Sequence, residues 1–460
     1  MELTWSYPHI AKEKDGEEQI KKAAKFCEGY KKFLDISKTE RECVNTAEIM
    51  LVNAGYERFD PEKEYKPGDK IYEINRGKSL LATTWGTAPL EEGVRINGAH
   101  IDSPRLDLKP NPLIEKGEMA QFKTHYYGGI KKYQWVTVPL AMHGTVIRKD
   151  GTVATICIGE DESDPVFYIS DLLIHLAADQ MEKKLRDGIK AEDLNIIVGT
   201  VPFIGGKVKA ETEKAIKYNA LKLLNEKYDI TEHDFARAEI EFVPAGKARD
   251  VGFDRSLIAA YGHDDRVCAY PALMAELETK KPYYTTVTVL TDKEEIGSVG
   301  NTGVATNYLY DYIYFLAKNK GAEIKTVCAN SCCLSADVNS AYDPTWADAF
   351  ETQNSSWINH GVVLTKYTGA RGKSGANDAS AEYMAKVIDI MDDAHVYWQI
   401  GELGKVDKGG GGTIAQYISM LNIDVVDLGV PVLSMHAPIE AVSKLDVYNT
   451  YAAFKAFYKN

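Results

Sequence analysis

The sequence predicts an α/β fold, in which helices cover both faces of a central sheet. From residue 249 onward, strand-like and helix-like segments alternate, as they do in a sheet that is covered by helices on both sides. In addition, four apolar, strand-like runs end beside residues of metal-ligand type, and sites in open α/β sheets form outside the carboxyl ends of the strands. These runs are Gly93–Ala99 before His100, Thr285–Thr291 before Asp292-Lys293-Glu294-Glu295, Thr326–Ala336 before Asp337, and Pro431–Met435 before His436.

The bulk properties are those of a globular protein of ordinary composition. The chain has 460 residues, 45% hydrophobic and 26% charged, which suits two or three domains. Its formal charge of −13 argues against nucleic acid or an anionic membrane as the main partner. No apolar run approaches the roughly 18 residues of a membrane span, and no signal peptide is evident. Seven scattered cysteines without a CxxC pair indicate reduced thiols, so we expect a cytoplasmic protein.

The first hundred residues are expected to contain two helices and then strands. The helices are predicted over residues 17–33 and 38–54, and Ser37 with Glu40 has the spacing of a capping box at the start of the second one. Gly55 stands where a glycine commonly ends a helix. Strands are then predicted over Lys70–Asn75 and Ser79–Trp85.

A β-rich insertion is predicted over residues 108–248. After Pro104 the chain consists of short β-like pieces separated by glycine-bearing turns. Every residue of metal-ligand type named above lies outside this stretch. We therefore expect residues 1–107 and 249–460 to form one domain that the insertion interrupts. Within the insertion, the pattern predicts helices over Ser170–Asp187 and Glu211–Lys227 and a strand over Ala238–Pro244.

The pair Glu294-Glu295 is the most informative feature for function. Neighbouring side chains diverge at the end of a strand, so one carboxylate can bind a metal while the other faces the attacking water. A metal lowers the pKa of water to about 7, and a nearby carboxylate can take its proton. An isolated acidic pair is usually a solvated loop. The other ligand types at strand ends favour the catalytic interpretation here.

Three further features supply possible ligands. In His100-Ile101-Asp102 the carboxylate can orient the imidazole of a metal-binding histidine. Asp264-Asp265 precedes the helix-like stretch Val267–Leu277 and could bridge two metals or cap the helix. His436 follows a strand-like run, where an ordinary structural histidine is the alternative. Two histidines with several carboxylates suit a borderline divalent ion such as Zn²⁺.

Two glycine-bearing segments, Thr368–Asn377 and Lys408–Thr413, do not have the spacing of a phosphate-binding loop. A Walker-type loop would need a glycine five residues before Gly372, where the chain has Tyr367. Either segment could be a backbone-donor loop close to substrate or a flexible connector. Gly412 and Thr413 are the candidate substrate contacts in the second segment.

Taken together, the chain resembles the aspartyl aminopeptidase and vacuolar aminopeptidase I family of co-catalytic zinc exopeptidases, over nearly its whole length. Each matching motif is weak alone, but the ordered set is specific. The motifs are His100-Ile101-Asp102-Ser103-Pro104, Leu108-Lys109-Pro110, Tyr127-Gly128-Gly129, Trp135, Ile174-His175-Leu176, Asp264-Asp265-Arg266, Asp292-Lys293-Glu294-Glu295-Ile296-Gly297-Ser298, Ser335-Ala336-Asp337 and Ser434-Met435-His436.

The resemblance implies a mixed central sheet flanked by helices, with the insertion acting as a dimerisation domain of a tetrahedral dodecamer. It also implies two Zn²⁺ per subunit, with Co²⁺ or Mn²⁺ as alternatives. By this resemblance, one metal would be bound by His100, Asp264 and Asp337, and the other by Asp264, Glu295 and His436. Glu294 would be the general base, and Asp102 would orient His100. His175 would contribute to the site of a neighbouring subunit.

Departures from the family pattern bear on selectivity. Lys293 replaces a histidine, and Ser340 and Asp343 stand where relatives carry two histidines before Pro344. Lys366, with Arg371 or Lys373, could bind an acidic substrate side chain, whereas Asp343 would repel one. We therefore expect an aminopeptidase for peptides with neutral N-terminal residues.

Two kinds of alternative remain at this point. The related one is another self-compartmentalising tetrahedral aminopeptidase, or a dinuclear zinc carboxypeptidase or deacylase. The unrelated one is a catalytically silent assembly or carrier protein on the same fold.

Overall fold

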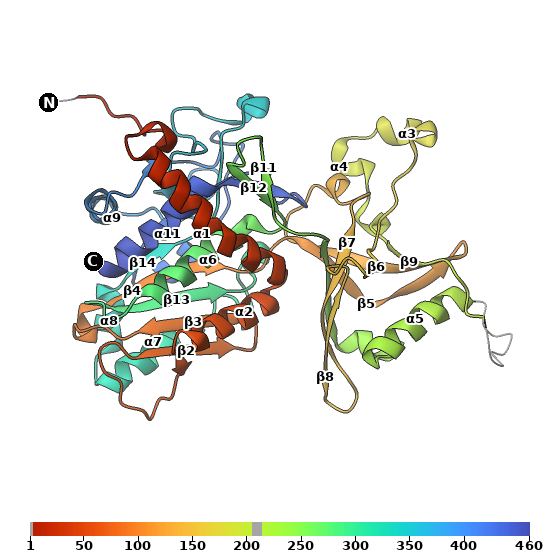
Figure 1. Cartoon of the computed structure of the whole chain (residues 1–460), viewed down its shortest axis with the longest axis horizontal. Helices are drawn as coiled ribbons and strands as arrows, with labels where there is room; N and C mark the ends of the chain where they lie inside the picture. Colours follow the sequence, from red (N-terminus) through yellow and green to blue (C-terminus); the bar gives the residue numbers. More distant parts are fainter. Residues whose placement is uncertain (1–2, 205–213) are drawn as a thin grey trace. The chain divides into compact units, whose positions relative to one another are not determined.

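The computed structural model describes residues 3–204 and 214–460, which form two compact units (Figure 1). The first unit comprises the chain up to Ser103, Ala248–Met435 and Glu440–Asn460. The second comprises Pro104–Lys247 together with His436–Ile439. The chain therefore leaves the first unit and returns to it, and a four-residue segment near the C-terminus groups with the second.

A nine-stranded mixed sheet forms the centre of the first unit. Its four inner strands β13, β4, β14 and β18 are parallel to one another, whereas β3 and β16 pair antiparallel at either side of this group. This mixed sheet with flanking helices confirms the predicted fold class. In spatial order the strands are β1 (Glu57–Arg58), β2 (Lys70–Asn75), β3 (Ser79–Thr84), β13 (Thr285–Thr291), β4 (Val94–His100), β14 (Cys332–Ser335), β18 (Asp424–Gly429), β16 (Val362–Thr365) and β17 (Trp398–Ile400).

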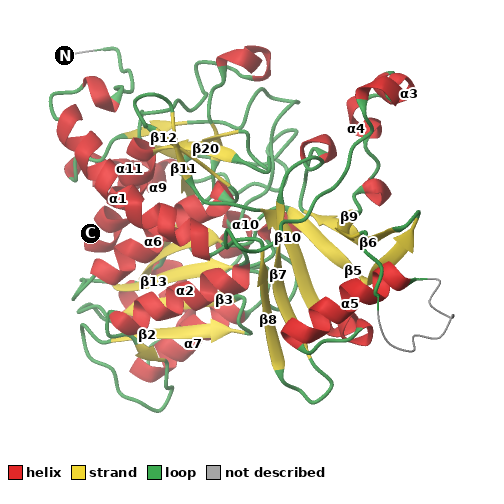
Figure 2. Ribbon diagram, turned by 45° about the vertical axis from the view of Figure 1, so that its right-hand side comes forward, coloured by secondary structure: helices red, strands yellow, loops and turns green. Residues whose placement is uncertain are grey.

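Separate hydrophobic cores lie on the two faces of this sheet, because successive strand residues point to opposite sides. Leu80 lies in one core and Leu81 in the other, and the adjacent Cys332 and Cys333 divide in the same way. The helices of this unit, shown in Figure 2, therefore fall into two groups, one packed against each face of the sheet. The first core includes α1 (Gly16–Ile36), α2 (Glu40–Asn53), α6 (His263–Glu278), α9 (Ala381–Asp393) and α11 (Lys444–Lys459); the second includes α7 (Tyr308–Lys320), α8 (Ile324–Asn330) and α10 (Ala415–Ser419).

A smaller, five-stranded sheet completes the first unit. Its strands, in spatial order, are β11 (Arg249–Val251), β12 (Leu257–Ala260), β20 (Glu440–Ser443), β19 (Pro431–Leu433) and β15 (Asn339–Ser340). The second unit has one antiparallel sheet, on which α5 (Ala215–Tyr228) packs (Figure 1). The order there is β8 (Val153–Ile158), β7 (Leu140–Ile147), β10 (Ala238–Pro244), β5 (Arg105–Lys116), β6 (Met119–Tyr127) and β9 (Ile196–Gly199).

The predicted strands β2, β10 and β13 have the same bounds in the structure as in the sequence analysis. The predicted strand Thr326–Ala336 is wrong in its first half, which is helix α8. Glu323 caps this helix by accepting the N–H of Lys325 at 3.3 Å, and Val327 is fully buried in the second core. Tertiary burial of the helix therefore overrides the β-branched composition of the segment.

The capping box of the second helix is two residues later than predicted. The Thr39 hydroxyl accepts the N–H of Glu42 at 3.3 Å, and the Glu42 carboxylate accepts the N–H of Thr39 at 3.1 Å. Ser37 and Glu40 have the same spacing, but Ser37 instead bonds to the hydroxyl of Thr46 at 3.0 Å. Spacing alone does not distinguish the two candidate capping boxes, and the side-chain hydrogen bonds of the folded protein decide between them.

The predicted helix over Ser170–Asp187 is also wrong. This stretch contains a short 3-10 turn at Ile174–Leu176 and two four-residue helices, α3 (Ala178–Met181) and α4 (Leu185–Gly188). The side chains of Ile174 and Leu176 are 69% and 67% exposed. Among the residues that the structure describes, these apolar side chains find no surface to pack on, and most helix stability comes from such packing. In the predicted helix Glu211–Lys227, residues 211–213 lie outside the described residues, and the rest corresponds to α5.

Candidate metal centre

Acidic side chains and one histidine converge at the carboxyl ends of the inner parallel strands. His100 is the last residue of β4, Asp337 follows β14 by two residues, and Glu294 follows β13 by three. The Nε2 atom of His100 lies 3.2 Å from Oδ1 of Asp264, 3.7 Å from Oδ1 of Asp337 and 4.0 Å from Oε2 of Glu294. Parallel neighbours bring their carboxyl ends to one edge of the sheet, as the sequence predicted.

The donor atoms form two overlapping groups, each compact enough to hold a metal ion. One donor atom each from His100, Asp264 and Glu295 lies within 4.8 Å of the others, and the same holds for His100, Asp265 and Asp337. The side chains of His100, Asp264 and Asp265 are almost completely buried. An imidazole among several carboxylates is a donor set that Zn²⁺ accepts.

The electrostatics of the cluster favour a cation. Burial and the nearby Asp337 raise the pKa of Glu294 to about 8. Burial also raises the pKa of Asp337, and Asp264 adds to that effect. These carboxylates repel one another in a medium of low dielectric, and a divalent ion between them would remove the repulsion. The residues present therefore fit a metal site.

Asp264 and Asp265 are positioned by the irregular start of α6. The helix is preceded by Gly262 in the left-handed region, and neither aspartate has helical backbone angles. A capping residue also lies outside the helical region, so the alternative of a helix cap stays a prediction. The N–H of Asp264 donates to Oε2 of Glu440 at 3.0 Å, and the Ser103 hydroxyl donates to the Asp264 carbonyl at 2.5 Å. Asp265 was not predicted as a separate ligand; its only signal was its place beside Asp264.

Asp102 contacts two parts of the cluster. Its Oδ1 lies 3.4 Å from Nδ1 of His100, and its backbone carbonyl oxygen lies 3.0 Å from the same nitrogen. The carboxylate also accepts the N–H groups of Glu294 at 3.1 Å and Glu295 at 3.2 Å. The same carboxylate thus faces the histidine and holds the loop that carries both glutamates. The second of these contacts has no signal in the sequence.

Lys293, which departs from the family pattern, forms an ion pair beside the glutamates. Its ammonium lies 2.7 Å from Oδ2 of Asp292, a carboxylate that is 1% exposed and also accepts the Thr302 hydroxyl at 2.6 Å. The lysine therefore offsets a buried negative charge at the end of β13.

Two predicted site residues belong to the second unit. His436 groups there, and its Nδ1 lies 2.7 Å from the carbonyl oxygen of Gly129. His175 lies in the exposed 3-10 turn Ile174–Leu176. The described contacts of the first unit thus bring together His100, Asp102, Asp264, Glu294, Glu295 and Asp337 but do not include these two histidines.

The predicted substrate contacts in the first unit have identifiable partners. The Lys366 ammonium lies 2.6 Å from Oδ1 of Asp378, whose Oδ2 lies 2.9 Å from the ammonium of Lys373. The Asp343 carboxylate accepts the N–H of Thr345 at 2.8 Å. Thr413 donates its hydroxyl to Oδ1 of Asp427 at 2.7 Å, whereas Gly412 is exposed.

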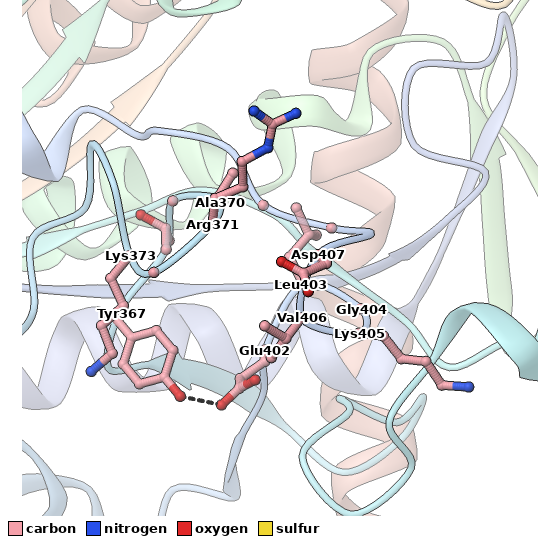
Figure 3. Close-up of a pocket in the computed structure, with 15 residues that line it drawn as sticks. Tyr367, Ala370, Arg371, Lys373, Glu402, Leu403, Gly404, Lys405, Val406 and Asp407 are labelled. Carbon is pink, nitrogen blue, oxygen red and sulfur yellow. Dashed lines mark hydrogen bonds between the residues drawn. The ribbon is translucent and has the colours of Figure 1, made fainter.

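The two glycine-bearing segments meet and enclose a pocket of about 250 Å³ (Figure 3). The N–H of Gly369 donates to the carbonyl of Gly411 at 2.6 Å, which joins them directly. In the pocket wall the Tyr367 hydroxyl is hydrogen-bonded to Glu402, and the ammonium of Lys373 lies 3.8 Å from the centre of the Tyr367 ring. Residues 367–373 line one side of this pocket and residues 402–407, 409 and 410 the other. None of the described helices is long and apolar enough to cross a membrane.

Comparisons with known proteins point to a family of metallopeptidases. The family model described as aminopeptidase I zinc metalloprotease (M18) matches residues 33–458. A probable M18 family aminopeptidase 1 of Clostridium acetobutylicum is 47% identical over 456 residues, covering 97% of each chain. The crystal structure of an M18 aminopeptidase from Thermotoga maritima superposes with a TM-score of 0.92 at 42% identity, covering 99% of this chain and 100% of that one. The dodecamer structure of S. cerevisiae mApe1 shares the fold, with a TM-score of 0.77 at 21% identity over 96% of this chain and 97% of that one.

The fold and the site therefore define a metallopeptidase of the zinc exopeptidase type. The chain belongs to the M18 family of aminopeptidases, which are zinc metalloproteases. This confirms the family resemblance seen in the sequence and the prediction of a peptide-bond hydrolase.

Proposed function

We propose that this M18 enzyme is a dinuclear aminopeptidase that binds two zinc ions per chain. His100, Asp264 and Asp337 would hold one ion, and Asp264, Glu295 and His436 the other, with Co²⁺ or Mn²⁺ as alternative metals. The observation that carries the proposal is the compact donor set at the carboxyl ends of β4, β13 and β14. Asp265 lies within reach of His100 and Asp337 and is the alternative to Asp264 in the first set.

In this proposal, Glu294 is the general base. Zinc, when bound, polarises the scissile carbonyl and lowers the pKa of the attacking water. Glu294 takes a proton from that water and passes it to the departing amine. Its carboxylate lies beside the donor cluster, and Asp102 fixes its backbone N–H. Asp102 would in addition orient the imidazole of His100.

We expect neutral N-terminal residues to be preferred over acidic ones. An acidic side chain needs an available cation, but the Lys366 and Lys373 ammoniums already share Asp378. Asp343 adds negative charge at a position where the family pattern implied by the resemblance has histidine. The test is a comparison of kcat/KM for Asp-, Glu-, Leu-, Met- and Lys-nitroanilides at fixed metal and salt. A preference above tenfold for Asp or Glu would contradict this selectivity.

We also propose that the second unit is a dimerisation domain, that the protein assembles as a tetrahedral dodecamer, and that it acts in the cytoplasm. Exposed apolar side chains in the second unit, including Ile174, Leu176 and Leu185, support self-association, because exposed apolar groups that cluster commonly mark interfaces. The yeast relative with the same fold is described as a dodecamer. All seven cysteines are free thiols, six of them buried, which suits a reducing compartment.

The decisive test combines metal stoichiometry with a substrate panel. After reconstitution with Zn²⁺, Co²⁺ or Mn²⁺, we expect about two ions per chain and cleavage of free aminoacyl-nitroanilides. Cleavage of C-terminal residues from N-acetylated peptides would instead favour a carboxypeptidase, and loss of the acetyl group a deacylase. Bound metal without any hydrolysis would favour an assembly or carrier role. Less than one ion per chain would exclude the dinuclear proposal.

A further inference from the structure

We propose that Asp427 is a positioning residue, which holds the glycine-rich segment Lys408–Gly412 in place through Thr413 so that this segment can form a wall of the substrate site. The inference rests on the proposed aminopeptidase function. Under this proposal Thr413 is not itself a substrate contact. The side chain of Thr413 anchors the segment, and the backbone of the preceding glycines faces the peptide.

Asp427 is a buried carboxyl group at the same sheet edge as the metal ligands. It lies in β18 directly opposite Ser335 of β14, and Asp337 follows Ser335 by two residues. Its Oδ1 accepts the hydroxyls of Thr413 at 2.7 Å and Ser335 at 3.2 Å, while its side chain is 3% exposed. A buried acid is costly unless it makes such contacts, so this position needs a reason. None of the metal-site interactions described above uses it.

Thr413 has little capacity left for a substrate. Its hydroxyl donates to Asp427 and also accepts the N–H of Ala415 at 3.3 Å, and the residue is 8% exposed. These bonds fix the point at which the glycine-rich segment enters α10. Because a hydroxyl has a single proton to donate, that proton is already used.

The middle of α10 is tied to the loop of the proposed base. The hydroxyl of Tyr417 donates to the carbonyl of Gly297 at 3.0 Å, and the N–H of Gly297 donates to the carbonyl of Glu294 at 2.8 Å. The side chain of Ile414, the residue after Thr413, lies 3.3 Å from the position that a Cβ on Gly98 would take. Gly98 precedes His100 by two residues. The segment anchored by Asp427 therefore adjoins two parts of the donor cluster.

The glycines themselves are packed against their surroundings, which favours a fixed wall over a flexible connector. A Cβ on Gly410 would lie 2.0 Å from the carbonyl oxygen of Gly369, and one on Gly409 would lie 1.8 Å from that of Leu403. A Cβ on Gly411 would have no atom within 4 Å, and one on Gly412 would make only ordinary contacts, the nearest at 3.5 Å. Both residues are exposed. Gly412 and the N–H of Gly411 are therefore the groups we expect to face a peptide backbone, since the Gly411 carbonyl already accepts the N–H of Gly369.

The test compares Thr413→Val, which removes the hydroxyl at nearly constant shape, with Thr413→Ser, which keeps it. Thr84→Val is the matched control, because the Thr84 hydroxyl also donates at 2.7 Å to a buried carboxylate, that of Glu276. Thr84 pairs with Thr286, near the start of β13, whereas Glu294 follows the end of that strand. Metal content, kcat, KM and amide hydrogen exchange of residues 408–413 are measured for each purified, metal-loaded variant.

We expect Thr413→Val to raise KM about five- to tenfold and to leave kcat within about twofold, because a loosened wall must be ordered again by the substrate. Its metal content should be unchanged and the exchange of residues 408–413 faster. Thr413→Ser should restore both, and Thr84→Val should lower stability without changing KM. Asp427→Asn, which keeps an acceptor oxygen, should behave like Thr413→Ser.

Hydrogen exchange separates this inference from the proposed function. If the wild-type protein hydrolyses no peptide, the proposed function fails, and faster exchange in Thr413→Val alone would still support the anchor. Unchanged exchange and KM in Thr413→Val would overturn the inference. An equal rise of KM in Thr84→Val would overturn it too, because the effect would then follow from lost stability.

Discussion

Glu294 and Glu295 are neighbours in the chain but have different surroundings. Glu295 offers an oxygen to the compact group that contains His100 and Asp264, whereas the nearest recorded contact of Glu294 with that group is 4.0 Å, to Nε2 of His100. Both backbone N–H groups are held by Asp102. The two carboxylates thus lie in different surroundings, and in the proposed function Glu295 binds the metal while Glu294 moves the proton.

Replacement of each glutamate by glutamine should therefore have a distinct outcome. Glu294→Gln should retain the metal and lower kcat by about 10²–10⁴-fold, the usual scale for a general base. Glu295→Gln should lose metal as well as activity, because an amide is a poorer ligand than a carboxylate. Metal analysis after dialysis and kcat on Leu-nitroanilide check both. The reverse pattern would show that the two roles are exchanged.

Among the secondary-structure elements, the end of β18 constrains Asp337, the proposed metal ligand that follows β14. A Cβ on Gly429 would lie 1.7 Å from the carbonyl oxygen of Asp337. The two strands are parallel neighbours, so the backbone of Asp337 passes directly beside the last residue of β18. A side chain at that position would displace Asp337.

Gly429→Ala should accordingly weaken metal binding and lower the free energy of unfolding by about 1–3 kcal/mol, as expected for overpacking at a buried backbone contact. Gly199→Ala is the matched control, because Gly199 also ends a strand but has no atom within 4 Å of its Cβ position. Metal titration and denaturant unfolding provide the measurements. Equal effects of the two substitutions would contradict the steric explanation.

A second relation between elements joins α1, β11 and α11 through Asp250. Its Oδ1 lies 2.9 Å from the ammoniums of both Lys31 and Lys444, and its Oδ2 lies 3.0 Å from Nε of Arg255. Burial alone would raise the pKa of Asp250, but these cations hold it well below its usual range. The ionised form is thus favoured in the folded protein.

Asp250→Asn should lower the free energy of unfolding by about 1–2 kcal/mol at pH 7. Because the pKa is lower in the folded state, the carboxylate stabilises the fold above its unfolded pKa of about 3.9, and this contribution is lost as the pH falls further. The difference between wild type and variant should therefore shrink below about pH 4 in urea unfolding. Glu18→Gln, which removes an exposed pair with Lys22 on α1, should cost about 0.5 kcal/mol or less. A difference for Asp250→Asn that does not vary with pH would contradict the ion-pair account.

At the scale of the whole molecule, the second unit carries one candidate catalytic residue outside the donor cluster. His175 lies between Ile174 and Leu176, whose side chains are exposed in the single chain. Such a turn is unlike a structural element that packs within its own chain. Contribution to a neighbouring subunit's site would explain the exposure.

His175→Ala should impair activity although it leaves the metal content unchanged. Mixing inactive Glu294→Gln subunits with inactive His175→Ala subunits should restore part of the activity, because some sites then receive both intact residues. Glu294→Gln mixed with Glu295→Gln is the control, since both defects lie in the same unit of each chain and should not complement. Absence of recovery in the first mixture, with subunit exchange shown by mass spectrometry, would count against a shared site.

The sequence by itself indicated where several strands lie and which residues of metal-ligand type stand at their ends. Strands such as β13 are visible as short apolar runs, and the residues after them, including His100, Glu294 and Asp337, could be selected because strand ends meet at one edge. These are local patterns. They do not depend on which strand lies beside which.

Only the tertiary structure decided which groups meet across long sequence separations. The order β13, β4, β14, β18 brings Asp102 beneath the N–H groups of Glu294 and Glu295 and places Asp427 beside Ser335. Likewise, the predicted helix Ser170–Asp187 fails because most of its large apolar side chains, among them Ile174 and Leu176, find no burial among the described residues. Such contacts depend on packing between segments far apart in sequence, and hydrophobic periodicity records only the faces of individual elements.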